Sequence, residues 1–354
     1  MSDFDYGNPR LRAMKARLLT AHDLESMAAS TSLEALIAAL SKTPYQDKIK
    51  EALSHAHGIE CIQLALRLDL LKLTALLQTY YPGKAAEAIE TLLWNYDIQN
   101  IKAILRGLTL MLPTEDILSA LLPAGVIPES ILHRLAHSAN LGEALSTIVT
   151  LQLPFSSSIL RTISTEDTSD PKTLEVALEN WYFTYALKQT DRASREDAKI
   201  LRQYFQSQAD HINLSLVLRM VGNPLQAERL EQNLNELMIH SGSFSLDFLK
   251  VLLKQENLDQ AVALCDKTAY YSALKTGLQN SKLSGKRSQM EDALRLSILS
   301  WAVKLIPDHP LGIGVPLGYL TLKRNEVRNL RWISLGILAG MPTAEIVKGL
   351  ERVP

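Results

Sequence analysis

Two histidines, His133 and His137, stand four residues apart in the sequence, at the spacing that puts two side chains on one face of a helix. Such a pair could bind a metal ion. The stretch "HRLAH" lacks the glutamate of a zinc-protease helix, however, and no third ligand lies nearby. A surface or interhelix hydrogen-bonding role is therefore expected, and no metal and no cofactor is predicted.

Two glycine-containing stretches share parts of known phosphate-binding loops. "SGKRS" from Ser284 lacks the upstream glycine of a nucleotide-binding loop and follows a helical pattern instead of a buried strand. "GIGVPLG" from Gly312 lacks the strand and helix context of a dinucleotide fold. Both are expected to be turns. Since a GxSxG motif is also absent, the sequence predicts no catalytic residues.

A polar motif, an acid followed three residues later by asparagine, occurs three times. The surrounding stretches are "YDIQNIKAIL" from Tyr96, "ADHINLSLVL" from Ala209 and "NEVRNLRWIS" from Asn325. The pairs are Asp97 and Asn100, Asp210 and Asn213, and Glu326 and Asn329. An acid at the start of a helix can cap free backbone N–H groups, which is the expected role here. Alternatively, the asparagines are polar links between modules. Both interpretations are structural.

Basic residues form two clusters. Their members are Arg10, Arg12, Lys15 and Arg17, and then Lys323, Arg324, Arg328 and Arg331. The default interpretation of such a cluster is a solvated helix face. The alternative is docking onto acidic loops or onto a helix of a partner. Nucleic acid is a poor candidate because no aromatic residues are interleaved with the basic ones.

The elements that carry these residues are expected to be helices, because apolar residues recur at spacings of three and four and alternating strand patterns are few. The chain of 354 residues is 47% hydrophobic and 21% charged, which allows a large core. A net charge of -1 gives no general attraction to nucleic acid or to an anionic membrane. No signal peptide and no membrane span is expected. Cys61 and Cys265 are expected to be free, buried thiols in a reducing compartment.

Three markers recur with a period of about 115 residues. The acids of the motif are separated by 113 and then 116 residues. A glutamate early in an apolar helix recurs as Glu60, Glu175 and Glu291, and a helix that ends in an aromatic residue recurs at Tyr45, Phe155 and Tyr270. Three markers in the same order predict a triplicated all-α module. The period is long enough for each copy to have a core of its own.

The predicted modules are residues 1–112, 113–224 and 225–354. The polar stretches 163–172 and 280–289 are expected to be loops within modules. A partial fourth copy is predicted at the start of the chain, from Asn8 to Asp23. Here, as at Asp116 and Glu345, a threonine precedes the acid and is expected to cap a helix. The three modules would then be related by a pseudo-threefold axis.

Several blocks of the sequence, taken in order, resemble the C subunit of the rotary V/A-type ATPases, which is called the d subunit in eukaryotic vacuolar enzymes. The blocks are "DYGNPRLRAMKARLL", "LEALIAALSKTPY", "YDIQNIKAILRG", "LEVALENWYF" and "PLGYLTLKRNEVRNLRWISLGILAGMP". The resemblance covers essentially the whole chain. Its most specific residues are Tyr6, Asn8 and Arg10, followed by Tyr319, Lys323, Glu326, Asn329, Leu330 and Arg331. The sequence departs from the family pattern at Asn325, where an acid is common, and at Leu335 and Gly336.

The resemblance implies three similar helical domains arranged as a funnel with a central hole. It also implies a non-catalytic component of an ion-translocating rotary ATPase or ATP synthase. Such a component would rest on the cytoplasmic face of the membrane rotor ring of proteolipid subunits and receive the shaft made by the D and F subunits. The two basic clusters are then candidate contacts with the ring or the shaft. The rival hypothesis is a helical-repeat interaction scaffold unrelated to rotary ATPases.

Overall fold

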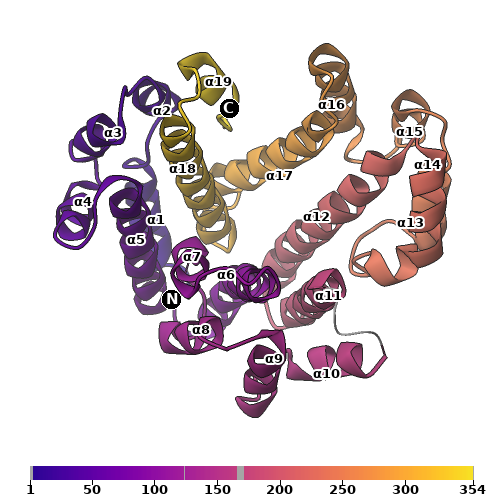
Figure 1. The fold of residues 1–354 in the computed structure, drawn as a ribbon, viewed down its shortest axis with the longest axis horizontal. Helices are drawn as coiled ribbons and strands as arrows, with labels where there is room; N and C mark the ends of the chain where they lie inside the picture. Colours follow the sequence, from indigo (N-terminus) through magenta and orange to yellow (C-terminus); the bar gives the residue numbers. More distant parts are fainter. Residues whose placement is uncertain (1–2, 123, 166–170, 354) are drawn as a thin grey trace. The chain divides into compact units, whose positions relative to one another are not determined.

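The computed structural model of the protein describes residues 3–122, 124–165 and 171–353. Every regular element in these ranges is an α-helix, which confirms the predicted all-α fold class (Figure 1). The chain forms two compact units, one of Met1–Thr147 with Ala302–Pro354 and the other of Ile148–Trp301. The division into three modules at residues 112 and 224 and the funnel with its central hole stay predictions.

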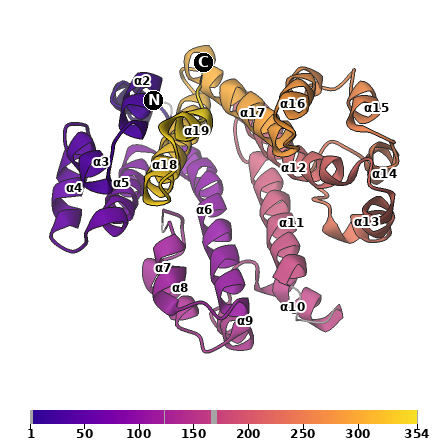
Figure 2. The same ribbon diagram turned by 45° about the horizontal axis from the view of Figure 1, so that its top comes forward.

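The first unit contains helices from both ends of the sequence. They are α1 (Gly7–Lys15), α2 (Ala21–Ala28), α3 (Leu33–Leu40), α4 (Gln46–Leu53), α5 (Gly58–Tyr80), α6 (Gly83–Thr109), α7 (Thr114–Ala120), α8 (Glu129–Ala136), most of α9 (Leu141–Thr150), the end of α17 (Ser288–Asp308), α18 (Gly314–Leu338) and α19 (Thr343–Lys348). The late helix α18 packs against the early helices α1, α2, α3 and α5, and α19 packs against α2. Figure 2 shows α18 between α5 and α6, both of which it also contacts.

The second unit is built around the long helix α12. Its helices are α10 (Ser156–Thr165), α11 (Pro171–Thr190), α12 (Arg195–Met220), α13 (Pro224–Leu237), α14 (Leu246–Leu253), α15 (Leu258–Ala263), α16 (Tyr271–Ser284) and most of α17. Leu214 and Val217 of α12 lie in one core with Leu249 and Leu252 of α14 and with Leu294 of α17. These residues are all but inaccessible to solvent, which gives this unit a hydrophobic core of its own.

Several local expectations need correction. The acid–asparagine motifs do not start helices: they lie within α6, α12 and α18, each of which begins at least ten residues earlier. Thr20 caps α2 as predicted, and Asp23 returns the bond to complete a capping box. Thr114 and Thr343 do not cap, because they are the first residues of α7 and α19 and follow prolines at the cap positions.

The polar stretch 280–289 is mostly helical, since α16 continues to Ser284 and α17 begins at Ser288. Gly285 ends α16 in the left-handed conformation, with φ of 69°. Of the other predicted loop, residues 166–170 lie outside the described residues, and the residues on either side belong to α10 and α11. "GIGVPLG" forms the end of a turn and the beginning of α18 at Gly314.

Helices α6 and α18 end in the same way, which shows a local repeat at the level of backbone hydrogen bonds. Leu112 N donates to Gly107 O and Met111 N to Leu108 O, while Met341 N donates to Gly336 O and Gly340 N to Ile337 O. Both are Schellman ends, in which one residue takes a left-handed conformation. That residue is Gly340 in α18 (φ 65°) but Met111 after α6 (φ 51°), whose side chain is 90% exposed.

We expect the substitutions Met111→Gly and Gly340→Ala to change stability in opposite directions. A Cβ atom in the left-handed conformation costs about 1 kcal/mol, and glycine avoids this cost. A Cβ atom on Gly340 would meet nothing within 4 Å, so only the backbone conformation contributes there. Met111→Gly should stabilise the protein by about 1 kcal/mol and Gly340→Ala should destabilise it by a similar amount. The denaturant concentration at the midpoint of unfolding measures both stability changes. Shifts of this midpoint in the same direction for the two variants would contradict the prediction.

Candidate functional site

The three asparagines of the repeated motif make the same pair of hydrogen bonds. Each accepts the backbone N–H and donates to the backbone C=O of one residue in a later loop. Asn100 contacts Leu122 (2.8 and 2.9 Å), Asn213 contacts Ile239 (2.7 and 2.9 Å) and Asn329 contacts Glu351 (2.9 and 3.0 Å). All three side chains are buried. The buried side-chain amide of each asparagine thus satisfies both the N–H and the C=O of one backbone residue that passes over the long helix.

In the first two copies, the acid accepts hydrogen bonds from residues that lie a few positions after the one contacted by the asparagine. Asp97 accepts the N–H groups of Val126 (2.6 Å) and Ile127 (3.1 Å). Asp210 accepts the N–H and the hydroxyl of Ser243 and the hydroxyl of Tyr270 (2.7, 2.6 and 2.7 Å). The acids therefore bind free backbone N–H groups, as the sequence suggested, but on a different segment from their own helix.

Asp97 is a buried carboxylic acid group, and burial changes its pKa. Its side chain is completely buried. Burial raises the pKa of Asp97 to about 7, although the N–H groups of Val126 and Ile127 act to lower it. Because the folded pKa lies above the ordinary value of 3.8, the folded protein retains a proton that the unfolded chain releases. This contribution to stability is full below about pH 4 and is lost as the pH rises through about 7.

We therefore expect the free energy of unfolding of the wild type to fall more steeply between pH 5 and pH 8 than that of Asp97→Asn. Each pH unit between the two pKa values is worth about 1.4 kcal/mol, which limits the effect to about 4 kcal/mol. Asp259→Asn is the control, because Asp259 pairs with Lys282 at the surface. Parallel pH profiles for the wild type and Asp97→Asn would contradict the prediction.

The third acid, Glu326, is the centre of a larger buried network. Its Oε2 accepts the N–H of Leu19 (2.6 Å), and its Oε1 accepts the hydroxyl of Tyr45 (2.7 Å) and the ammonium group of Lys323 (2.7 Å). The same ammonium group lies 2.6 Å from Oδ2 of Asp69 and donates to the Tyr45 hydroxyl at 2.8 Å. Five residues from α5, α18 and two N-terminal loops thus meet in one network.

The charges in this network compensate one another. Burial acts to lower the pKa of Lys323, but the carboxylates of Glu326 and Asp69 outweigh it and raise that pKa above its ordinary value. Burial, together with the same two carboxylates, also raises the pKa of Tyr45 well above its ordinary value. Tyr45 is therefore a neutral hydroxyl donor, and Lys323 is a buried cation with two acidic partners.

Tyr45→Phe should destabilise the protein more than Tyr270→Phe. Each substitution removes a hydroxyl that donates to a carboxylate at 2.7 Å, an interaction worth about 1.5–3 kcal/mol. Tyr45 is 2% exposed, whereas Tyr270 is only partly buried, so water can replace its hydroxyl. We expect about 2–3 kcal/mol for Tyr45→Phe and about 1 kcal/mol for Tyr270→Phe. Equilibrium unfolding measures both losses, and the reverse order would contradict this expectation.

The contacts of the third motif copy join the two ends of the sequence. In the first two copies the contacted loop follows the long helix of the motif closely in the sequence. In the third copy Asn329 contacts Glu351, whereas Glu326 contacts Leu19, more than three hundred positions away in the sequence. We call this junction, formed by residues 15–24, 322–326 and 350–353, the seam. Side chains of Glu326, Tyr45 and Lys323 hold the seam together.

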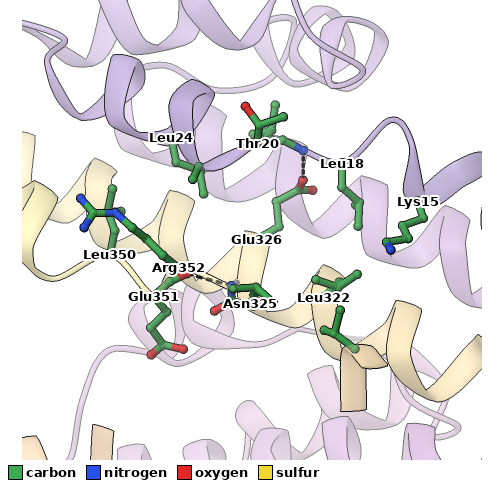
Figure 3. Close-up of a pocket in the computed structure, with 14 residues that line it drawn as sticks. Lys15, Leu18, Thr20, Leu24, Leu322, Asn325, Glu326, Leu350, Glu351 and Arg352 are labelled. Atoms are coloured by element: carbon green, nitrogen blue, oxygen red, sulfur yellow. Dashed lines mark hydrogen bonds between the residues drawn. The ribbon is translucent and has the colours of Figure 1, made fainter. Parts of the chain in front are cut away.

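A cavity of about 260 Å³ lies in the seam (Figure 3). Leu18, Leu24, Leu322 and Leu350 contribute apolar surface, and Lys15 and Arg352 bring positive charge to the lining. Asn325 lines the same cavity and donates to Glu351 O at 3.0 Å.

The basic residues predicted as contacts differ in accessibility. Arg10, Arg12, Lys15 and Arg17, on or just after α1, are exposed, as is Arg328. Arg324 and Arg331 are partly buried, and Arg324 contacts Asn95 and the ring of Tyr96. Lys323 is buried in the network with Glu326 and Asp69, so the second cluster does not form one exposed face.

The other sequence candidates have local structural contacts. The imidazole rings of His133 and His137 stack with their centroids 6.3 Å apart. Nε2 of His133 lies 3.4 Å from Oε1 of Glu129. Within the described ranges, no group of three or more potential metal ligands comes together.

Cys61 and Cys265 are free and buried, as predicted. Arg287 of "SGKRS" donates to the carbonyls of Leu218, Arg219 and Val221 at the end of α12. In the described part of the chain, no helix is both long and apolar enough to cross a membrane.

Fold and site together define an all-helical protein in which three long helices, α6, α12 and α18, each carry an acid and an asparagine that bind other segments of the chain. A family model, the ATP synthase (C/AC39) subunit, matches residues 7–349. The chain therefore belongs to the C/AC39 subunit family of ATP synthases, which confirms the resemblance and excludes the rival hypothesis of an unrelated scaffold.

Curated relatives agree along almost the whole chain. The C subunit of an A-type ATP synthase from Pyrococcus horikoshii is 27% identical over 94% of this chain and 85% of the relative. The C subunit of a V-type ATP synthase from Deinococcus radiodurans is 26% identical over 99% of this chain and 91% of the relative. The C subunit of an A-type ATP synthase from Methanocaldococcus jannaschii is 25% identical over 98% and 86%, respectively.

Proposed function

We propose that this protein is a non-catalytic socket in the central stalk of a V/A-type rotary ATPase or ATP synthase. It binds the lower end of the shaft formed by the D and F subunits and rests on the cytoplasmic face of the proteolipid rotor ring. In this role it transmits torque between ion movement through the membrane sector and ATP synthesis or hydrolysis in the head. The observation that carries the proposal is the family match over residues 7–349.

The physical properties of the chain support this role. A part that transmits torque must resist deformation, and close-packed helical cores are stiff. The repeated motif adds stiffness because Asn100, Asn213 and Asn329 each connect a long helix to a separate backbone segment with two hydrogen bonds. The buried network of Lys323 and Glu326 performs the same task at the seam, where it connects residues that are far apart in the sequence.

The exposed basic residues on and after α1 are the proposed electrostatic contacts with the ring or the shaft. Arg10, Arg12, Lys15 and Arg17 lie close together in the sequence, and Arg12 also donates to Ile306 O at 3.2 Å. Arg328 is exposed as well, although its Nε pairs with Oε1 of Glu351 at 2.6 Å. Arg324 and Arg331 would contribute from their partly buried positions. Exposed charges of this kind speed association and make binding sensitive to salt.

The test is a binding measurement with the purified full chain against the D–F pair and, separately, against the detergent-solubilised rotor ring. The proposal expects specific binding to both. A folded chain that binds neither would contradict the socket role.

Charge reversal tests the basic contacts in the same assay. Arg10→Glu combined with Arg17→Glu should weaken binding to one partner and reduce its salt dependence. The control is Lys267→Glu with Lys275→Glu, two exposed lysines in the second unit. If both double variants bind like the wild type while the wild type binds both partners, the electrostatic contacts are refuted and the socket role stands.

A further inference from the structure

One face of α18 carries a row of five residues that are exposed or partly exposed to solvent. They follow one another at spacings of four, three, four and three residues, which places them in line along the helix. The row, which we call the α18 stripe, consists of Arg324, Arg328, Arg331, Leu335 and Leu338. Leu335 is 51% exposed and Leu338 is 58% exposed, so two large apolar side chains at the end of the row face solvent.

The other faces of α18 are packed within the first unit. Lys323 and Glu326 lie in the buried network that holds the seam. Near the end of the helix, a Cβ atom on Gly336 would come within 2.8 Å of Cγ1 of Ile346 in α19. The α18 stripe therefore belongs to a helix that contacts on its other faces already hold in place.

The α18 stripe changes from cationic to apolar along its length. Its first three residues are arginines, its last two are leucines, and none of the five is acidic. The row spans about 21 Å, or about four turns, at the helical rise of 1.5 Å per residue. A straight row of this length fits a second helix that lies along it. The charge complement of such a row is a helix with acidic residues opposite the arginines and aliphatic residues opposite the leucines.

Two of the three arginines already have partners within the chain. Arg328 pairs with Glu351, and Arg324 contacts Asn95. Arg331, in contrast, has no hydrogen bond or ion pair with any described residue. Burial lowers the pKa of Arg331, and no carboxylate of the described residues acts to raise it. A largely buried guanidinium without an acceptor is unfavourable, and a carboxylate from a partner would remove that cost.

Arg219 of α12 shows how a carboxylate satisfies an arginine on a long helix. Its Nε and Nη2 donate to the two carboxylate oxygens of Glu291 at 2.5 and 2.6 Å, and these bonds raise the pKa of Arg219. Among the guanidinium nitrogens of Arg331, only Nε is enclosed without a partner, and the side chain as a whole is partly exposed. A carboxylate of another protein can therefore contact the terminal nitrogens.

We propose that the α18 stripe binds an acidic, amphipathic α-helix of the shaft. A carboxylate of that helix pairs with Arg331, and its aliphatic side chains pack on Leu335 and Leu338. The leucine contacts keep water away from the ion pair and so strengthen it. This inference rests on the proposed function, which supplies the shaft as the partner, and it assigns α18 to the shaft and not to the ring.

The first test is binding of full-length variants to the purified D–F pair. Arg331→Met removes the charge and keeps most of the side-chain length. Binding should weaken at least tenfold and depend less on salt. The thermal midpoint of the variant should equal or exceed that of the wild type, because no internal partner loses its cation. Unchanged binding with a lower midpoint would give Arg331 a structural role and overturn the proposal.

The apolar end of the α18 stripe is tested by combining Leu335→Glu with Leu338→Glu. This double variant should also bind the D–F pair at least tenfold more weakly. The matched control is Leu225→Glu with Leu283→Glu, because these leucines are 75% and 88% exposed in the second unit. The control should bind like the wild type, and both stripe variants should bind the detergent-solubilised ring like the wild type.

The outcomes separate this inference from the socket role. If the wild type binds the D–F pair and both stripe variants bind it equally well, the α18 stripe is not the shaft site, although the socket role stands. Variants that lose the ring but keep the shaft would assign the stripe to the ring and refute the inference as well. A folded wild-type chain that binds neither partner would contradict the socket role and this inference together.

Discussion

Lys323→Met should destabilise the protein by about 3–5 kcal/mol, because it removes one partner from a buried ion pair. Methionine matches the length of the lysine side chain, so packing changes little. The carboxylates of Glu326 and Asp69, however, lose the cation that lies 2.7 and 2.6 Å from them. Glu326 is 4% exposed, so its charge has no access to bulk water. Denaturant unfolding followed by circular dichroism measures the loss.

The control for this substitution is Lys282→Met, which removes an ion pair with Asp259 at 2.5 Å. Both partners are more than half exposed, and such pairs contribute at most about 1 kcal/mol. Adding Asp69→Asn to Lys323→Met should recover part of the stability, because it removes one of the two carboxylates left without a cation. A loss below about 1 kcal/mol for Lys323→Met would show that the network does not hold the seam.

Helical periodicity and the spacing of the markers are sufficient to predict the all-α fold, but the motif alone does not give its position within its helix. An acid followed by an asparagine three residues later fits a helix start and a helix interior equally well. The apolar residues before Asp97, among them Ile89, Leu92 and Leu93, continue the helical period and place α6 much earlier. Extending the pattern backwards would have found the interior position.

The buried role of Lys323 could also have been inferred in part. By charge alone, Lys323 belongs to a basic cluster with three arginines of the same helix. Lys323, Glu326 and Leu330 nevertheless follow at spacings of three and four and share one face, which the structure buries. Tyr45 and Glu326 are 281 positions apart, and no local pattern connects them. Their pairing depends on how the two ends of the sequence meet, which only the folded chain reveals.

The repeat itself contained a clue to the tyrosine contacts. The aromatic marker is tyrosine at positions 45 and 270 and phenylalanine at 155, and the two tyrosines are the residues that donate to Glu326 and Asp210. A hydroxyl present at the same place in two internal copies suggests a buried polar partner. Spacing alone treats these aromatic residues as markers and does not distinguish tyrosine from phenylalanine.

Asn213→Leu should cost about 3 kcal/mol, because it tests the contact that all three copies share. Leucine fills the same volume but leaves both the N–H and the C=O of Ile239 without partners in a buried site. Each unsatisfied buried group costs about 1–3 kcal/mol. The loss should appear in denaturant unfolding and in faster hydrogen exchange at the amide of Ile239.

Asn180 offers a matched control on the same loop. It donates to Met238 O and accepts from His240 N, both at 3.0 Å, so it flanks the residue that Asn213 contacts. Asn180 is only partly buried, and water can replace its amide when it is removed. Asn180→Leu should therefore cost about 1 kcal/mol or less. Because both asparagines contact one short loop, the double variant should lose less than the two single losses added together. Equal losses from the two single variants would mean that burial does not decide the strength of the contact, and the common structural role assigned to Asn100, Asn213 and Asn329 would then fail.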